Sequence, residues 1–289
     1  MSRAVFFTDT AADFSAPLAG SSPVELKRFP DGELYARIPA PVAGRDALVM
    51  GRCYPAPDAE LFKVLVVVGA LKAQGAAEIA AFIPYLPYAR MDKSVKEGEA
   101  VTADIVCGLL SAAGCAELIT VDCHFLKQGE GGFSRAGLKI RNHSAASALL
   151  AYFKGKAENP VVTSPDKGAA HMSAKAEGGE SMEKARGGYA SGGAAYREVE
   201  SLEAGFDAEG RDVIIIDDMI STGSTMVKAV KVLKAAGAKK VFCAATHGLL
   251  LAGSHGKLLE AGAEEVVCTD SIVSPASKVS VTGLAGLMQ

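Results

Sequence analysis

The segment with the clearest chemical character is VIIIDDMISTGST, residues 213–225. Its branched apolar residues predict a buried strand over residues 213–216, and two carboxylates, Asp217 and Asp218, stand at the end of that strand. A loop of hydroxyl residues and glycine then runs into a helical pattern. Because ligands of open α/β sheets bind at the carboxyl ends of the strands, we expect a ligand at this loop.

The loop has the chemistry of an anion site, since N–H groups and hydroxyls at a helix N-terminus suit a phosphate. The residues that would form this cradle are Ser221, Thr222, Gly223, Ser224 and Thr225. The two carboxylates would repel a second phosphate but accept hydrogen bonds from the hydroxyls of a pentose. The segment has neither the Walker A pattern nor the dinucleotide pattern. A sugar phosphate is therefore the predicted ligand.

The elements around this segment alternate between short apolar runs and helical patterns, which predicts an α/β fold of mostly parallel sheets flanked by helices. The expected strands are residues 47–50, 79–83, 118–121, 161–163, 213–216, 241–245 and 266–269. The expected helices are residues 61–74, 103–112 and 225–236. The phrase A-x-G-A ends two of these helices, which suggests that the two halves are copies of one unit.

The length of 289 residues corresponds to about two domains at roughly 150 residues each. We expect a first domain over residues 1–141 and a second over residues 142–289, with the last residues packing back on the first. Between Glu177 and Arg197 the chain is rich in glycine, which predicts a mobile loop that acts as a lid or a connector.

The composition excludes several classes of function. Thirty Lys and Arg against 33 Asp and Glu give a net charge of −3, which argues against a general nucleic-acid binder. Every apolar run is far shorter than the roughly 20 residues that cross a bilayer, so no membrane partner is expected. The six cysteines lack metal-binding spacing, which suits reduced thiols in the cytoplasm.

Residues 217–225 resemble the 5-phosphoribosyl 1-diphosphate (PRPP) binding signature of type I phosphoribosyltransferases and PRPP synthetases. Four further segments resemble motifs of PRPP synthetase, also called ribose-phosphate diphosphokinase, and they occur in the expected order. They are RFPDGE at 28–33, PYLPYARMD at 84–92, VDCH at 121–124 and SPDKGA at 164–169. The resemblance spans nearly the whole chain, and residues 96–99 look like the archaeal type.

The resemblance implies two tandem phosphoribosyltransferase-like domains, the first for ATP and the second for ribose 5-phosphate. The reaction of such a family moves the diphosphoryl group of ATP to the 1-hydroxyl of ribose 5-phosphate and depends on Mg²⁺. Phosphoryl transfer of this kind relies on positioning and charge neutralisation. The implied ATP-binding residues are Phe29, Asp31, Glu33, Arg90, Asp92 and His124.

The first three of these residues would come from a neighbouring subunit, so the resemblance also implies a homo-oligomer of at least two subunits. The plainer interpretation of Asp31 and Gly32 is an ordinary turn between two strands. Met91 stands where the family usually has glutamine, which leaves the donor nucleotide open.

For the diphosphate the resemblance implies a tight turn and two cations. The turn consists of Asp166, Lys167, Gly168, Ala169 and Ala170. Asp166 is an implied magnesium ligand, as is His124, and the catalytic cations would be Lys184 and Arg186 on the glycine-rich loop.

Two other functions fit the residues. A phosphoribosyltransferase would consume PRPP, although simple members of that class lack the segments at 28–33 and 84–92. A catalytically silent relative would bind nucleotide or sugar phosphate and regulate a true synthetase. Assays distinguish the three functions. A synthetase forms PRPP, a phosphoribosyltransferase releases diphosphate from PRPP, and a silent relative binds its ligand without turnover.

Overall fold

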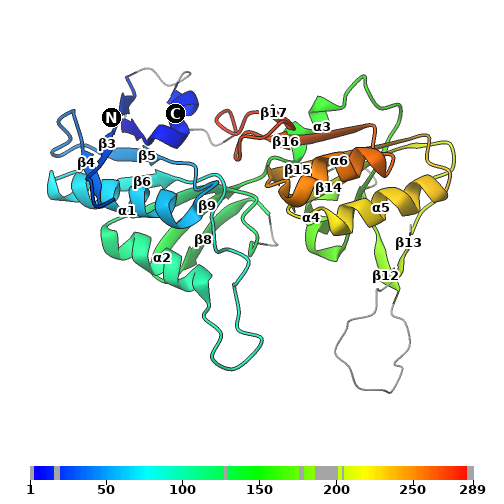
Figure 1. Cartoon of the computed structure of the whole chain (residues 1–289), viewed down its shortest axis with the longest axis horizontal. Coiled ribbons are helices and arrows are strands. Elements are labelled where there is room, and N and C mark those ends of the chain that lie inside the picture. Colours follow the sequence, from blue (N-terminus) through cyan, green and yellow to red (C-terminus); the bar gives the residue numbers. More distant parts are fainter. Residues whose placement is uncertain are drawn as a thin grey trace. The chain divides into compact units, whose positions relative to one another are not determined.

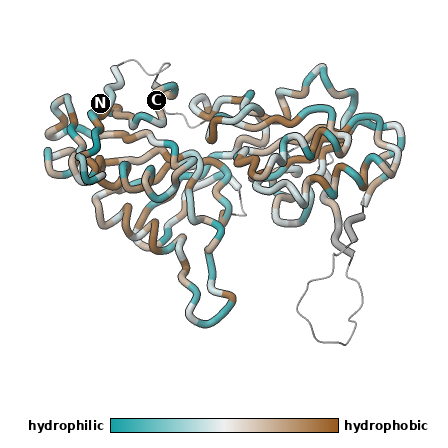
Figure 2. Tube along the Cα trace, viewed as in Figure 1, coloured by the Kyte–Doolittle hydropathy of each residue, from teal (hydrophilic) through white to brown (hydrophobic). Residues whose placement is uncertain are grey.

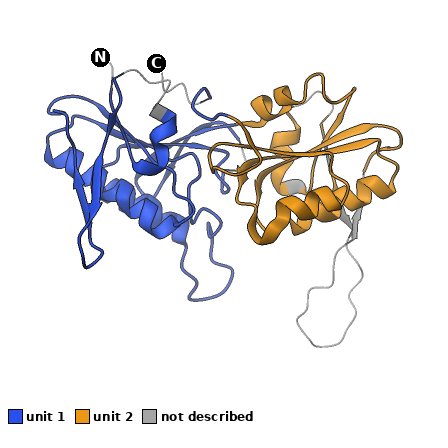
Figure 3. Cartoon of the chain, turned by 45° about the horizontal axis from the view of Figure 1, so that its top comes forward, with its two compact units in different colours: residues 1–144, 280–289 blue, residues 145–279 orange. Residues whose placement is uncertain are grey.

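The computed structural model of the chain describes residues 3–15, 20–126, 129–175, 179–185, 201–203 and 205–284. The chain divides into two compact units, which Figure 3 shows in blue and orange. Unit 1 comprises residues 1–144 and 280–289, and unit 2 comprises residues 145–279. Each unit is built on its own β-sheet with helices packed against it (Figure 1).

The sheet of unit 1 has seven strands in the order β2-β1-β5-β6-β7-β9-β8. The strands are β1 (Ala4–Phe7), β2 (Ser22–Pro23), β5 (Ala47–Met50), β6 (Ile79–Phe82), β7 (Glu117–Val121), β8 (Gly131–Arg135) and β9 (Leu138–His143). Every neighbouring pair is parallel except β8 with β9, which form an antiparallel hairpin. The central strands β5 and β6 are buried along their whole length, as strands covered on both faces must be.

Two helices, α1 (Pro57–Ala73) and α2 (Thr102–Ala113), connect the central strands of this sheet and pack against each other. A short 3-10 helix, η1 (Asp9–Ser15), follows β1. A separate antiparallel hairpin of β3 (Glu25–Arg28) and β4 (Leu34–Arg37) packs on α1 through β4. Figure 2 shows that the apolar segments concentrate in the strands of both units.

The sheet of unit 2 has six parallel strands in the order β11-β10-β14-β15-β16-β17. The strands are β10 (Val161–Ser164), β11 (Glu180–Ser181), β14 (Asp212–Ile220), β15 (Lys240–Gly248), β16 (Glu265–Thr269) and β17 (Ser277–Val279). The helices are α3 (Ala146–Tyr152), η2 (Lys167–Ala169), α4 (Ala170–Ser173), α5 (Ser224–Ala235), η3 (Leu251–Gly253) and α6 (Ser254–Glu260). A small antiparallel pair, β12 (Glu183–Ala185) with β13 (Ser201–Glu203), completes the unit.

The expected alternation of strands and helices is confirmed, and the two A-x-G-A phrases end α1 and α5 as predicted. Gly75 and Gly237 follow these helices with φ angles of 80° and 83°, a conformation that glycine adopts without strain. The strand expected over residues 213–216 was too short. Strand β14 does not end at Ile216 but continues to Ile220, because β15 pairs with it as far as Gly248. Asp217 and Asp218 therefore lie within a strand.

Several elements of unit 1 were not foreseen from the sequence. The β8–β9 hairpin occupies residues 131–143, so the first sheet continues two residues past the boundary expected after residue 141. The alternating pattern of β9 is clear, with Leu138, Ile140 and Asn142 buried and the residues between them facing solvent. Among the described residues, every helix is too short or too polar to span a bilayer.

Candidate active site

Three carboxylates gather at the carboxyl edge of the sheet in unit 2. Strands β10 and β14 are parallel neighbours, with Thr163 opposite Ile215, so the ends of both strands lie at the same edge. Asp166 follows the end of β10, and Asp217 and Asp218 lie in the last part of β14. The structure thus brings together two segments that are about fifty residues apart in the sequence.

The nearby carboxylates affect the pKa of Asp217. Burial raises the pKa of Asp217 well above its usual value, and the negative charges of Asp218 and Asp166 raise it further. Within the strand, the backbone N–H of Asp218 donates a hydrogen bond of 2.8 Å to Oδ1 of Asp217. A bound cation would offset the repulsion among these carboxylates, whose oxygens are the ligands that Mg²⁺ prefers.

The loop after β14 is short and held firmly from one side. Gly223 precedes α5 with a φ of 74°, and a Cβ at this position would lie 2.8 Å from Cβ of Ser254. The hydroxyl of Ser254 and the N–H of Leu251 both donate to the carbonyl oxygen of Ser221, at 3.2 and 2.9 Å. These contacts fix the loop directly before the N-terminus of α5.

The first helical hydrogen bond of α5 runs from the N–H of Val227 to the carbonyl oxygen of Gly223, at 2.8 Å. The N–H groups of residues 224–226 precede this bond, and such groups, together with the helix dipole, attract an anion. Ser224 and Thr225 are exposed, as is Thr222, and Ser221 is half-buried. Of the five residues expected to bind phosphate, four are therefore exposed or half-buried, and Gly223 is buried between them at one end of a twelve-residue helix.

The turn after β10 differs from the open cradle that the sequence suggests. Residues 167–169 form the 3-10 helix η2 and Ala170 begins α4. The N–H of Gly168 donates to Oδ1 of Asp166 at 2.8 Å, and the N–H of Ala169 donates to the carbonyl oxygen of Asp166 at 3.3 Å. Two of the N–H groups expected to hold a diphosphate are thus bonded within the turn.

Of the two cations expected to be catalytic, Lys184 lies in β12, where it pairs with Leu202 of β13. Arg186 lies outside the described residues. The Met182 side chain before them is fully buried in the core of unit 2, and its N–H donates to the carbonyl oxygen of Ser164 at 3.0 Å. Lys184 is therefore two residues from an anchor on the end of β10.

In unit 1, the expected ATP-binding residues follow two adjacent parallel strands. Arg90 and Asp92 belong to the segment after β6, and His124 follows β7, so both segments leave the same edge of the sheet. Arg90 is exposed, whereas Asp92 and His124 are half-buried. The segment with Asp92 is held in place by Arg135, whose Nη2 donates to the carbonyl oxygen of Asp92 at 2.6 Å.

The remaining residues assigned to ATP lie on the tip of the β3–β4 hairpin, in a separate sheet. Phe29 is 51% exposed, and its ring meets that of Tyr35 edge-on at 6.0 Å between centroids. Oδ1 of Asp31 accepts a hydrogen bond from the N–H of Glu33, and Gly32 has a φ of 93°. Asp31 and Gly32 thus form a turn between strands, and this turn presents Phe29, Asp31 and Glu33 to solvent.

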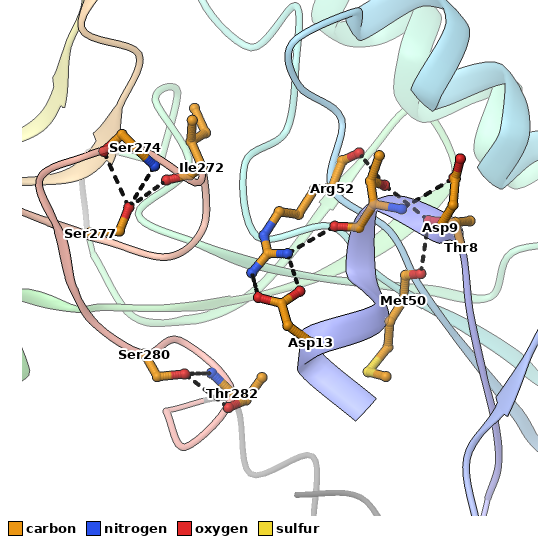
Figure 4. A network of polar contacts seen from close by, with 11 residues as sticks. Thr8, Asp9, Asp13, Met50, Arg52, Ile272, Ser274, Ser277, Ser280 and Thr282 are labelled. Carbon is orange, nitrogen blue, oxygen red and sulfur yellow. Dashed lines mark hydrogen bonds and ion pairs between the residues drawn. The ribbon is translucent and has the colours of Figure 1, made fainter. Parts of the chain in front are cut away.

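Sequence reasoning missed a buried cation at the carboxyl edge of unit 1, Arg52, which is 3% exposed. Its guanidinium group pairs with both carboxylate oxygens of Asp13 (Figure 4). It also donates to the carbonyl oxygen of Thr10 at 2.8 Å and lies 3.7 Å from the ring centroid of Phe14. The hydrogen bond from Arg52 lowers the pKa of Asp13. The signal in the sequence was an arginine two residues after an apolar strand, at the edge where ligands bind.

His247 lies at the corresponding edge of unit 2. It is 1% exposed on β15, and its Nδ1 lies 2.9 Å from the hydroxyl oxygen of Ser271. Ser271 and Thr269 in turn donate to the carbonyl oxygen of Thr246. These buried hydrogen bonds tie the end of β15 to the segment after β16.

Asp166, Asp217 and Asp218 lie at one edge of the sheet, but among the described residues no three His, Cys, Asp or Glu side chains are placed to hold a metal ion together. Mg²⁺ is usually held by one or two carboxylates together with water and substrate phosphates, so a magnesium site does not require such a cluster. The carboxylates of unit 2 are therefore a suitable donor set for Mg²⁺, in which the substrate supplies the remaining oxygens.

Comparisons with known proteins agree across the chain. Residues 11–114 match the family model described as the N-terminal domain of ribose phosphate pyrophosphokinase, and residues 194–285 match the phosphoribosyl synthetase-associated domain. A ribose-phosphate pyrophosphokinase from Methanothermobacter thermautotrophicus is 36% identical over 91% of this chain and 89% of its own length. A ribose-phosphate pyrophosphokinase from Methanopyrus kandleri is 36% identical over 94% of this chain and 90% of its own length.

A solved structure shows the same overall fold. The crystal structure of phosphoribosylpyrophosphate synthetase from Mycobacterium smegmatis superposes with a TM-score of 0.80 at 28% sequence identity. The match covers 98% of this chain and 96% of that chain. The α/β architecture is therefore shared over nearly the full length of both proteins.

Proposed function

The chain belongs to the ribose-phosphate pyrophosphokinase family, and we propose that its two units divide the substrates of that reaction between them. The protein is an enzyme that transfers the diphosphoryl group of ATP to the 1-hydroxyl of ribose 5-phosphate, which gives PRPP and AMP. The observation that carries this conclusion is the identity of about one third with archaeal members over nine tenths of the chain.

Unit 2 binds ribose 5-phosphate in this proposal. The 5-phosphate lies against the N–H groups and hydroxyls of residues 221–225, where the dipole of α5 and the fixed loop favour an anion. Asp217 and Asp218 accept hydrogen bonds from the ribose hydroxyls. This assignment rests on the order of elements in unit 2. Strand β14, which carries the two carboxylates, is followed after a short loop by the N-terminus of the twelve-residue helix α5.

Mg²⁺ is the proposed cofactor. Asp166 is a proposed ligand in unit 2, and His124 is a proposed ligand in unit 1. When bound, the ion neutralises charge on the phosphate oxygens of ATP. Asp166 holds the turn 166–169 together through its Oδ1 and carbonyl oxygen, and the Gly168 N–H can exchange Oδ1 for a phosphate oxygen. Lys167, Gly168, Ala169 and Ala170 then line the diphosphate.

Unit 1 binds ATP through Arg90, Asp92 and His124 in this proposal. The exposed hairpin tip with Phe29, Asp31 and Glu33 serves the adenine of a neighbouring subunit: the ring stacks and the carboxylates accept from the exocyclic amine. The active site thus requires at least a dimer. The six cysteines are all buried free thiols, and we propose a reducing, cytoplasmic location on that ground.

Lys184 and Arg186 are the proposed catalytic cations. Both belong to the glycine-rich segment of the sequence, and Lys184 comes two residues after the buried Met182. In this proposal the two cations bring positive charge to the phosphoryl group as it transfers. Because such charges act mainly in the transition state, their loss lowers turnover more than it lowers affinity for ribose 5-phosphate.

The test is a coupled assay for AMP and PRPP with ribose 5-phosphate, Mg²⁺ and ATP, run beside CTP and GTP because Met91 leaves the donor open. The expected result is equal amounts of PRPP and AMP with at least one donor. Absence of PRPP with every donor, while ribose 5-phosphate still binds, would contradict the proposal.

A further inference from the structure

In helix α1, two charged side chains are buried while a large apolar side chain is exposed to solvent. In its amino-terminal half, Glu60 and Lys63 are each only 8% exposed and pair with each other at 2.9 Å. Phe62, between them in the sequence, is 56% exposed. A helix that is apolar all round is normally buried on all sides. The outer face of α1 therefore has the composition of a covered surface.

The spacing of that outer face is regular. Phe62, Val66, Gly69 and Ala73 follow one another at intervals of four, three and four residues, and all four are exposed or half-exposed. This is the spacing of the seam along which one helix packs against another in a coiled coil. The outer face of α1 is thus suited to receive a second helix. On α2, which packs against α1, Ile105 and Leu109 are also exposed, at 52% and 49%.

The seam combines a large side chain, Phe62, with an open space at Gly69, and these two features complement each other in a pair of α1 helices. A Cβ built at Gly69 meets nothing within 4 Å, so there is open space beside this residue. If α1 packs antiparallel to a copy of itself, centred between Leu65 and Val66, position 62 of one helix faces position 69 of the other. The ring of Phe62 then fills the space at Gly69 of the second copy, twice, by symmetry.

The charges of α1 obey the same symmetry. Asp58 in the first turn and Lys72 in the last turn are both exposed, and they lie on the same flank of the seam. In the antiparallel pair Asp58 of each copy lies beside Lys72 of the other. These charges also favour the dipole of their own helix, so they support the pairing but do not carry it alone.

We propose that the outer face of α1 is a self-association surface, on which α1 of a second copy of this chain packs antiparallel about a two-fold axis near Val66. This names a surface for the oligomer that the proposed function requires. The tests of this inference measure mass and cross-linking instead of activity. The α1 surface can therefore be disproved while the enzymatic activity is confirmed, and the activity can be disproved while the α1 surface is confirmed.

The first test is the mass of the full chain by sedimentation equilibrium. Wild type is expected to associate, and Phe62→Glu is expected to raise the dissociation constant at least about thirtyfold, as for loss of a central aromatic contact. The matched control is Leu259→Glu on α6, where the side chain is also exposed, at 42%. A monomeric wild type, or Phe62→Glu with wild-type mass, overturns the proposal.

Gly69→Met covers the case in which Phe62→Glu fails to fold. Methionine is a better helix former than glycine, and the space at Gly69 is open, so the fold of unit 1 is expected to remain intact. The new side chain occupies the space needed by Phe62 of the second copy. Weakened association with a retained circular dichroism spectrum supports the proposal, and unchanged association contradicts it.

Cross-linking tests the direction of the pair. Val66→Cys lies next to the two-fold axis and is expected to form an interchain disulfide under mild oxidation, whereas the six native cysteines are buried. Ala73→Cys is on the same seam, but in an antiparallel pair its two copies lie about 22 Å apart along the axis, at 1.5 Å per residue, and cannot bridge. Cross-linking at 73 in place of 66 contradicts the proposed arrangement.

Discussion

The backbone N–H of Asp218 donates a hydrogen bond of 2.8 Å to Oδ1 of Asp217, inside a strand whose neighbour leads into Asp166. The three carboxylates belong to segments about fifty residues apart, and the parallel pairing of β10 with β14 brings them to one edge. Their mutual repulsion costs stability when no ligand is present. The same charge favours the binding of a cation and of ribose hydroxyls.

Asp217→Asn is expected to stabilise the protein and to impair the enzyme. Burial raises the pKa of Asp217, as do the charges of Asp218 and Asp166, so the native state loses stability as pH rises through the unfolded pKa toward that raised pKa. In EDTA at pH 8 the variant should melt at a higher temperature than wild type, with a smaller difference at pH 4. PRPP formation should fall at least about tenfold, since a hydrogen bond to a charged group is lost.

Thermal melting with and without Mg²⁺ and ribose 5-phosphate measures this effect. Asp207→Asn is the control, because Asp207 is exposed and lies before the amino end of β14, away from the site. If Asp217→Asn melts below wild type in EDTA at pH 8, the carboxylates do not repel one another as proposed.

Asp13→Asn is expected to lower stability at neutral pH and to flatten the acid dependence. The hydrogen bond from Arg52 lowers the pKa of Asp13, so its contribution is present above the unfolded pKa of about 3.9 and is lost as pH falls through the folded pKa. We expect a loss of about 1 to 2 kcal/mol at pH 7, less than for a fully buried pair because the Asp13 side chain is 59% exposed.

Urea unfolding between pH 3 and pH 7 measures this dependence. Toward the acid end of this range the two proteins should converge, since Asp13 becomes protonated in both states as the pH falls through its folded pKa. Glu97→Gln, which changes an exposed carboxylate, serves as the control. Parallel pH curves for wild type and Asp13→Asn would contradict the role given to the ion pair.

Gly223→Ala is expected to weaken both the fold and ribose 5-phosphate binding. An alanine at a φ of 74° is strained by about 1 kcal/mol, and its Cβ would also lie 2.8 Å from Cβ of Ser254. Gly210→Ala carries similar strain at a φ of 66° but has open space, and it precedes the amino end of β14.

Isothermal titration with ribose 5-phosphate separates the two variants. Both should lose thermal stability, while only the change at 223 should weaken ligand binding, by about tenfold, because the displaced loop is the proposed phosphate cradle. Equal affinity in both variants would place the phosphate elsewhere.

Lys184→Ala is expected to reduce kcat at least about a hundredfold, with the KM for ribose 5-phosphate changed less than about threefold, if the cation acts on the transition state. Lys231→Ala on the exposed side of α5 is the control and should retain wild-type kinetics. A rise in KM with unchanged kcat would assign Lys184 to binding instead of catalysis. Steady-state assays with each variant decide between these outcomes.

The sequence by itself determined the class of fold and the chemistry of the ligand. Short apolar runs alternating with helical patterns predicted strands over residues 47–50 and 79–83 and a helix over residues 225–236, each within one residue of its observed bounds. This accuracy is possible because hydrophobic periodicity and helix-ending glycines are local features of the sequence. The order of carboxylates, hydroxyls and glycine in residues 217–225 indicated a sugar phosphate, since these side chains and N–H groups have fixed hydrogen-bonding capacities.

Only the tertiary structure decided which groups are brought together and which are already engaged. The length of β14 depends on pairing with β15, and the turn at 166–169 closes on the carboxylate of Asp166 because the backbone there folds into η2. The burial of Arg52 over Phe14 and the exposure of Phe62 arise from packing between distant segments. Burial and pairing across a sheet are set by the whole fold, so no local pattern in the sequence could state them.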